Sequence, residues 1–144
     1  MDRLIEFITA HPILSFSWIG LFIAVIYLTV KGWLSKVKEI THTEAIALIN
    51  GQEAIIVDIR SANQFKQGHI ANAYNILPID IKNGSLGAIA KYRERPIIVV
   101  CDTGMNALKA ATDLYKAGFQ QVFTLKEGIS GWDSNNLPLV KGNK

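Results

Sequence analysis

The 144-residue sequence predicts an α/β domain with a five-stranded, mostly parallel sheet and helices on both faces, preceded by one transmembrane helix. From about residue 35 onward, short runs rich in β-branched residues alternate with helical patterns, which is typical of a parallel sheet. Before them, residues 7–30 contain no Asp, Glu, Lys or Arg. The sequence therefore divides into an anchor, residues 1–34, and one domain, residues 35–144.

The uncharged segment is long enough to cross a bilayer. A helix rises about 1.5 Å per residue and the hydrocarbon core is about 30 Å thick, so a span over about residues 10–30 suffices. A cleaved signal peptide and a buried core helix are the alternatives. A signal peptide begins with a basic region, but here Asp2 and Glu6 offset Arg3, and no small-residue cleavage site ends the run.

The charges that flank the span predict its orientation. Lys31, Lys36 and Lys38 follow it, whereas the short N-terminal segment has one Arg and two acidic residues. The positive-inside rule then predicts a single-pass protein of the inner (cytoplasmic) membrane, with the N-terminus outside and the C-terminal domain in the cytoplasm. The lipid bilayer is thus one expected partner, and the basic segment can also contact anionic headgroups.

The elements of the domain are expected in alternating order. Strands are expected at 37–40, 54–59, 73–76, 97–100 and 122–125, and helices at 41–50, 61–66, 86–92 and 105–117. Thr41 and Glu44 form a capping box at the start of the first of these helices, and Asn50-Gly51 ends it. The runs at 54–59 and 97–100 are expected to be buried strands of the sheet.

The helix at 105–117 has a clear apolar stripe. Leu108, Ala111, Leu114 and Tyr115 share one face, and charged residues lie off it. Gly118 then supplies a left-handed residue at the helix end, which lets the next residue, Phe119, pack back on Leu114. These residues predict both the inner face of the helix and its end.

Cys101 is the only cysteine, and it follows the strand at 97–100 directly. The loop Asp102-Thr103-Gly104 then leads to a helix N-terminus, where free N–H groups and the helix dipole favour an anion. This position suits a reactive thiolate, although a small buried hydrophobic residue is the alternative interpretation. A lone cysteine forms no internal disulfide, in agreement with a reducing compartment.

Three separated motifs resemble the rhodanese-homology family, and the resemblance covers nearly all of residues 37–140. They are VDIRSANQFKQGHIANAYNI at 57–76, CDTGMN at 101–106 and LKEGISGW at 125–132. The resemblance implies a rhodanese-like fold and sulfur transfer. Cys101 would be the nucleophile that takes sulfane sulfur from a donor such as thiosulfate and holds it as a persulfide. It would then pass the sulfur to a thiol or cyanide.

The resemblance also assigns roles to the residues around Cys101. A cradle of backbone N–H groups would bind the substrate, with Gly104 permitting its curvature; its members are Asp102, Thr103, Gly104, Met105, Asn106 and Ala107. Asp58 and Arg60 are expected to form a structural pair that gives electrostatic support. His69 is expected to hydrogen-bond the backbone near Ile70 and Asn72, and Asn72 to adopt a left-handed turn. No residues stand at metal-ligand spacing, so neither a metal nor another cofactor is expected.

Two residues of the loop depart from the family pattern. Asn106 occupies a position that is often basic in active rhodaneses, and the carboxylate of Asp102 opposes both thiolate formation and dianionic donors. Phosphate-ester hydrolysis, the reaction of related dual-specificity phosphatases, is excluded because it needs a loop one residue longer that ends on Arg.

Two hypotheses therefore remain. The first is a membrane-anchored sulfurtransferase with a small sulfur donor and a thiol acceptor. The second is a catalytically weak or inactive adaptor whose rhodanese fold binds an integral-membrane protein. Nothing in the sequence indicates nucleic acid as a partner.

Overall fold

A computed structural model describes residues 1–33 and 37–142 of the chain, which separates into two compact units, Met1–Ser35 and Lys36–Lys144. The boundary expected between residues 34 and 35 lies outside the described residues.

The N-terminal unit contains two helices, α1 (Asp2–Ala10) and α2 (Pro12–Trp33), where the sequence predicts one. Pro12 explains the break, because it has no N–H to donate and forces the preceding residue out of the helical region. His11 accordingly has φ −133° and ψ 65°. The helical segment Pro12–Lys31, with a mean hydropathy of 2.2, is long and apolar enough to be a candidate membrane span. This candidate segment overlaps the span expected over about residues 10–30.

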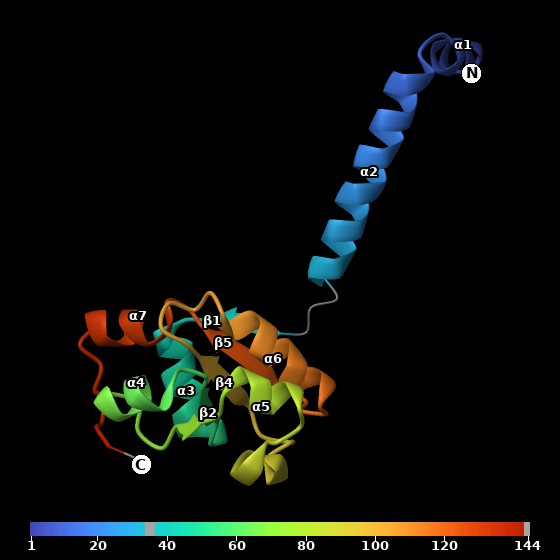
Figure 1. Cartoon of the computed structure of the whole chain (residues 1–144). Coiled ribbons are helices and arrows are strands. Elements are labelled where there is room, and N and C mark those ends of the chain that lie inside the picture. The colour runs from blue at the N-terminus through green and yellow to red at the C-terminus, as the bar shows by residue number, and fades with distance from the viewer. Residues whose placement is uncertain (34–36, 143–144) are drawn as a thin grey trace. The chain divides into compact units, whose positions relative to one another are not determined.

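The C-terminal unit is built on a parallel sheet of five strands in the order β1-β5-β4-β2-β3 (Figure 1). The strands are β1 (Lys38–Ile40), β2 (Ile55–Asp58), β3 (Tyr74–Asn75), β4 (Ile97–Val100) and β5 (Val122–Leu125). This arrangement confirms the predicted sheet. Strand β4 lies in its centre, and all four of its residues are buried. The carboxyl end of β4 therefore lies in the middle of the row formed by the carboxyl ends of the five strands.

Helices cover both faces of this sheet (Figure 1). One face carries α3 (His42–Gln52), α4 (Ala62–Gln67) and α7 (Gly128–Ser134); the other carries α5 (Pro78–Lys82), the 3₁₀-helix η1 (Gly87–Lys91) and α6 (Ala107–Lys116). Alternate β4 side chains enter the two cores: Ile97 and Val99 pack on the α6 side, and Ile98 and Val100 on the α3 side. The continuous apolar run of β4 therefore serves two hydrophobic cores.

The first helix of the domain begins as predicted and ends later. The Oγ1 of Thr41 accepts the Glu44 N–H at 3.3 Å, and Glu44 Oε2 accepts the Thr41 N–H at 2.8 Å, which confirms the capping box. However, α3 continues through Gly51 to Gln52. Glu53, with φ 53°, takes the left-handed position that ends the helix. The predicted stop at Asn50-Gly51 was therefore wrong by two residues.

Helix α6 corrects the predicted apolar stripe. Leu108 is 54 % exposed, whereas Ala107, Ala110, Ala111 and Leu114 face the core. The helix begins at Ala107 because the two preceding residues form a turn, and its small alanines allow it to lie close to the sheet. Leu108 consequently projects on the side away from the core.

The end of α6 agrees with the sequence. Gly118 has φ 106°, and the Phe119 N–H donates to the Leu114 carbonyl at 3.3 Å. Phe119 is buried in the same core as Leu114. In contrast, the short helices α5 and α7 were not predicted from the sequence, and the helix expected at 86–92 is the 3₁₀-helix η1.

Candidate active site

Cys101 lies directly after β4, at the carboxyl edge of the parallel sheet, where open α/β folds bind ligands. The residue is 5 % exposed. Its Sγ accepts a hydrogen bond from the Gly104 N–H at a distance of 3.0 Å. A backbone donor at this distance stabilises negative charge on sulfur, as a thiolate or a persulfide requires.

The other N–H groups of the loop are available to a ligand. Within the described part of the chain, the backbone N–H groups of Asp102, Thr103, Met105 and Asn106 have no hydrogen-bond acceptor. Ala107, the last residue of the predicted cradle, is the first residue of α6 and is buried. The loop therefore offers successive free donors beside the sulfur, as an anion-binding nest does.

Gly104 is required by the curvature of this loop. It has φ 87°, a conformation that side chains disfavour. A Cβ at this position would also lie 3.2 Å from the Leu125 carbonyl oxygen and 3.3 Å from the Glu127 nitrogen. The loop can thus pass close to the segment between β5 and α7 only because residue 104 has no side chain.

The N-terminus of α7 orients the first two peptide groups of the loop. The Ile129 N–H donates to the Cys101 carbonyl at 2.8 Å, and the Ser130 N–H donates to the Asp102 carbonyl at 2.9 Å. In a trans peptide the C=O and the following N–H point in opposite directions. These bonds therefore turn the N–H groups of Asp102 and Thr103 away from α7, which explains why the closing motif at 125–132 accompanies the loop.

The carboxylate of Asp102 has two partners outside the loop. Gln64 Nε2 donates to Asp102 Oδ2 at 2.7 Å, and the Arg60 guanidinium lies 3.6 Å from Oδ1. The side chain is 52 % exposed. The positive charge of Arg60 therefore offsets the negative charge of the carboxylate. This reduces the expected opposition of Asp102 to thiolate formation and to dianionic donors.

Asp58 and Arg60 form the expected pair at the end of β2. Arg60 Nε lies 3.0 Å from Asp58 Oδ1, its second terminal nitrogen lies 2.8 Å from Oδ2, and both side chains are buried. That same nitrogen of Arg60 donates to the Gly68 carbonyl at 2.6 Å. Because Arg60 also reaches Asp102, it joins the end of β2 to the cysteine loop. It thus acts in support of the loop.

His69 is buried but makes a different contact from the one expected. Its Nδ1 lies 2.7 Å from the Phe65 carbonyl oxygen, and its ring stacks on the Phe65 ring at 3.7 Å between centroids. The predicted partners near Ile70 and Asn72 were wrong, because His69 follows α4 and caps its last turn. Asn72 has the expected left-handed conformation, with φ 64°. Among the described residues, no cluster of His, Cys, Asp and Glu suits a metal ion.

A pocket of about 790 Å³ opens over Cys101. The loop residues form one side of it, and α5 and α6 form another through Pro78, Ile79, Lys82 and Lys109. Lys82 and the wall formed by α5 were not predicted from the sequence, because a five-residue helix has no visible periodicity. The two lysines supply positive charge that the loop itself lacks.

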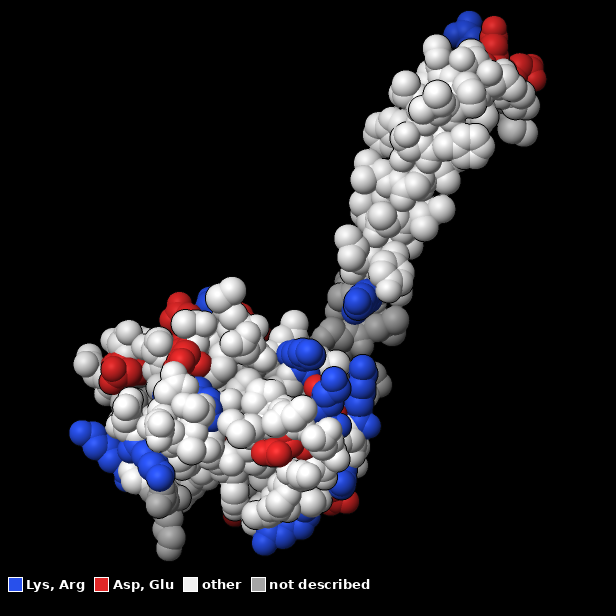
Figure 2. Space-filling model, viewed as in Figure 1, with Lys and Arg blue, Asp and Glu red and all other residues white. Residues whose placement is uncertain are grey.

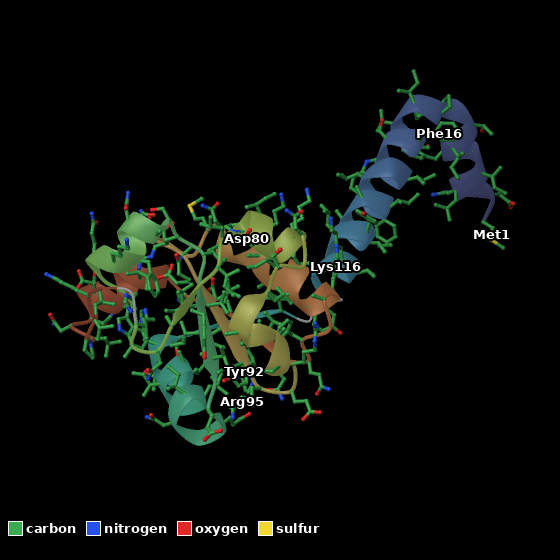
Figure 3. The ribbon with its side chains drawn as sticks, turned by 60° about the horizontal axis from the view of Figure 1, so that its bottom comes forward. Met1, Phe16, Asp80, Tyr92, Arg95 and Lys116 are labelled. Atoms are coloured by element: carbon green, nitrogen blue, oxygen red, sulfur yellow. The ribbon has the colours of Figure 1, made fainter. Side chains whose placement is uncertain are left out.

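The resolved pKa shifts lie away from this pocket. A side-chain hydrogen bond between Tyr74 and Tyr92 raises the pKa of Tyr74 and lowers that of Tyr92, and a hydrogen bond with Lys91 also lowers the pKa of Tyr92. Figure 3 shows Tyr92 and Arg95 together at one end of the domain, well apart from Asp80 of α5. The tyrosine pair is therefore not part of the cysteine site.

Comparison with known proteins gives one family. The model of the rhodanese-like domain matches residues 41–135. An uncharacterized Escherichia coli protein, YibN, is 48 % identical over 142 residues, which cover 99 % of each chain. A protein named thiosulfate sulfurtransferase GlpE, from Coxiella burnetii, is 30 % identical over 107 residues, covering 74 % of this chain and 96 % of that one.

A solved structure supports the same relationship. A thiosulfate sulfurtransferase from Pseudomonas aeruginosa superposes with a TM-score of 0.61 at 28 % identity, and the match covers 72 % of this chain and 20 % of that protein.

Proposed function

Because the chain belongs to the rhodanese-like domain family, we propose that it is a membrane-anchored sulfurtransferase that carries sulfane sulfur as a persulfide on Cys101. The observation that carries this proposal is the hydrogen bond from the Gly104 N–H to the cysteine sulfur, beside a run of unoccupied loop N–H groups. A neutral buried cysteine in a structural role has no need for such donors. A relative named thiosulfate sulfurtransferase supports the same reaction.

The loading step is a displacement at sulfur. The Cys101 thiolate attacks the sulfane sulfur of thiosulfate, a new S–S bond forms, and the original S–S bond breaks, with its electron pair leaving on sulfite. The product is the anionic persulfide of Cys101. The Gly104 N–H and the free N–H groups of the loop stabilise the charge on sulfur through this step.

Two lysines compensate for the absence of a basic residue at the end of the loop. Lys82 of α5 and Lys109 of α6 line the pocket, whereas Asn106 brings no charge. Asp102, paired with Arg60 and Gln64, has its charge offset. An anionic donor can therefore be drawn to the pocket by cations that the loop sequence does not contain.

The proposal places this chemistry beside a membrane. The segment Pro12–Lys31 would span the inner membrane once, with the N-terminus outside and the domain in the cytoplasm, where a lone thiol stays reduced. The anchor would keep the pocket close to the bilayer and to membrane proteins. The length and composition of α2 and the lysines after it support this location.

The test is the intact mass of the domain over residues 35–144. Both hydrophobic cores and all five strands lie within this segment, so it is expected to fold without the anchor. Incubation with thiosulfate or a persulfide donor should add the mass of one sulfur atom, and Cys101→Ser should abolish the gain. If no donor adds sulfur to the native domain, the sulfurtransferase proposal is wrong and the adaptor hypothesis takes its place.

A further inference from the structure

The first helix, α1, has an apolar face and a polar face. Successive residues of a helix turn by about 100°, so residues three or four apart share a face. The large apolar side chains lie on one face and are exposed: Leu4 (67 %), Ile5 (61 %), Phe7 (52 %) and Ile8 (52 %). The polar residues lie on the opposite face: Asp2, Arg3, Glu6 and Thr9. A helix of this pattern needs an apolar medium or partner along one side.

Helices α1 and α2 meet at a corner formed by His11. The His11 N–H donates to the Phe7 carbonyl at 3.0 Å and so ends α1. The His11 carbonyl accepts hydrogen bonds from the N–H and the Oγ of Ser15, at 3.1 Å and 3.0 Å, in the first turn of α2. Figure 3 shows α1 turning away from the axis of α2, with Met1 at its free end. The change of direction is therefore a built feature, and α1 does not lengthen the span.

The length of the candidate span determines where this corner lies in a bilayer. The segment Pro12–Lys31 has 20 residues. At about 1.5 Å per residue it covers about 30 Å, which is the thickness of the hydrocarbon core. With Lys31 at one boundary of that core, His11 falls at the other. Figure 2 shows charged side chains beyond both ends of α2 and white surface between them. Helix α1 therefore begins where acyl chains give way to headgroups.

Lipid is the occupant that this position favours for the apolar face of α1. A helix of nine residues with four large apolar side chains binds lipid weakly by itself. However, the span would hold α1 at the bilayer surface, so the effective concentration of lipid around it is high and a weak affinity is sufficient. The charges of Asp2, Arg3 and Glu6 prevent the helix from sinking into the hydrocarbon core.

We propose that α1 is an interfacial helix, which lies along the bilayer surface with its apolar face toward the acyl chains and its charged face in water. The inference rests on the proposed membrane anchoring by α2. It gives the chain a second lipid-contact surface, on the N-terminal side of the bilayer. A helix in this position also holds the start of the span at the boundary of the hydrocarbon core.

The experiment uses the full chain in vesicles of phosphatidylcholine and phosphatidylglycerol. Cys101→Ser removes the native thiol, and one spin-labelled cysteine is introduced at a time. Collisions of the label with oxygen, which concentrates in lipid, are compared with its collisions with a water-soluble nickel chelate. The ratio of oxygen to nickel collisions then measures how deep the label lies.

Four positions of α1 are compared with one in α2. Leu4→Cys and Ile8→Cys report on the apolar face, and Glu6→Cys and Thr9→Cys are the matched controls on the polar face. Phe22→Cys marks the middle of the candidate span. The ratio should be severalfold higher at the two apolar positions of α1 than at the two polar ones, and highest at Phe22→Cys.

The alternatives give different patterns. Equally low ratios at all four positions of α1 would place the helix in water, and equally high ratios would make it part of the span; either result overturns the inference. Broad spectra at Ile8→Cys that sharpen as lipid is added would assign the face to a second copy of the chain, which also overturns it. A low ratio at Phe22→Cys instead contradicts the proposed membrane anchor.

A second measurement tests the effect of α1 on the span. The double variant Leu4→Gln, Ile8→Gln removes the apolar face, and a label at Ile13→Cys then reports on the start of α2. The ratio of oxygen to nickel collisions there should fall, because this end of the span is no longer held at the boundary. An unchanged ratio would overturn the holding role.

Discussion

The side chain of Asn106 leaves the end of the cysteine loop without a positive charge. Asn106 is exposed, lines the pocket and makes no capping hydrogen bond to α6. Lys109 lies three residues later on the same helix and also lines the pocket. The cation nearest to the loop in sequence therefore stands one helical turn away from the position that a bidentate anion clamp would occupy.

Asn106→Arg should raise thiosulfate turnover. A guanidinium at this position adds charge-assisted hydrogen bonds to a dianionic donor, and a gain of about 1.4 kcal/mol corresponds to a tenfold rise in kcat/KM. The measurement is steady-state sulfite release by the 35–144 domain. Asn106→Gln, which extends the side chain without charge, is the control and should change the rate little. An unchanged or lower rate in Asn106→Arg would show that Lys82 and Lys109 already compensate the negative charge of the sulfur donor.

Cys101 and its loop could be predicted from the sequence because the relevant residues are consecutive. A β-branched run followed by Cys101 and Gly104 places the sulfur, the strand end and the curved loop together. Lys82 could not be found this way, since it reaches the pocket through tertiary packing of a five-residue helix. Leu108 misled the prediction because helical periodicity alone does not say which of two neighbouring stripes faces the sheet.

At the level of elements, the cysteine loop depends on its junction with α7. Gly128 begins this helix with φ 57°, and a Cβ there would lie 2.1 Å from the Cys101 carbonyl oxygen. The next two N–H groups, of Ile129 and Ser130, hold the loop carbonyls. The close approach of α7 is thus what fixes the first peptide groups of the cradle.

Gly128→Ala should destabilise the domain and disturb the loop. The overlap with the Cys101 carbonyl adds to the cost of a left-handed alanine, so the loss in unfolding free energy should reach at least about 2 kcal/mol. Gly84→Ala is the matched control, because Gly84 has φ 80° but open space around its Cα. It should cost only about 1 kcal/mol. Urea unfolding measures the free energy of unfolding of both variants. Equal losses in the two variants would contradict the role assigned to the junction between the cysteine loop and α7.

Most of the strands could also be predicted, but several short helices could not. The run at 97–100 matches β4 residue for residue, because a strand buried on both faces is continuously apolar, and the strand expected at 122–125 coincides with β5. Helix α7 contains Gly128 and Gly131, both poor helix formers. It is stabilised because its own Trp132 side chain packs in the core. Tertiary contacts of this kind override local propensity, and the sequence pattern does not reveal them.

At the level of the whole molecule, the chain combines a cysteine domain with an apolar helix that has the length of a membrane span. Lys31 lies at the end of the candidate span Pro12–Lys31, and basic residues continue at Lys36 and Lys38 in the sequence. On the other side, Asp2 and Glu6 outnumber Arg3. The charge asymmetry favours a cytoplasmic domain, and the reduced thiol that sulfur transfer requires agrees with that side of the membrane.

Protease protection in spheroplasts of a bacterial host tests this topology. With a short epitope tag at each end, protease added outside should remove the N-terminal tag and leave the C-terminal tag intact. Inverted inner-membrane vesicles should give the opposite pattern. A variant with Lys31, Lys36 and Lys38 changed to Gln and two Lys added before Asp2 reverses the charge difference, and a fraction of its chains should invert. Digestion of the C-terminal tag in spheroplasts of the native chain would place the domain outside, where a lone thiol is exposed to oxidation, and would contradict the proposed location. Extraction at alkaline pH separately checks the anchor, since a spanning helix stays with the membrane.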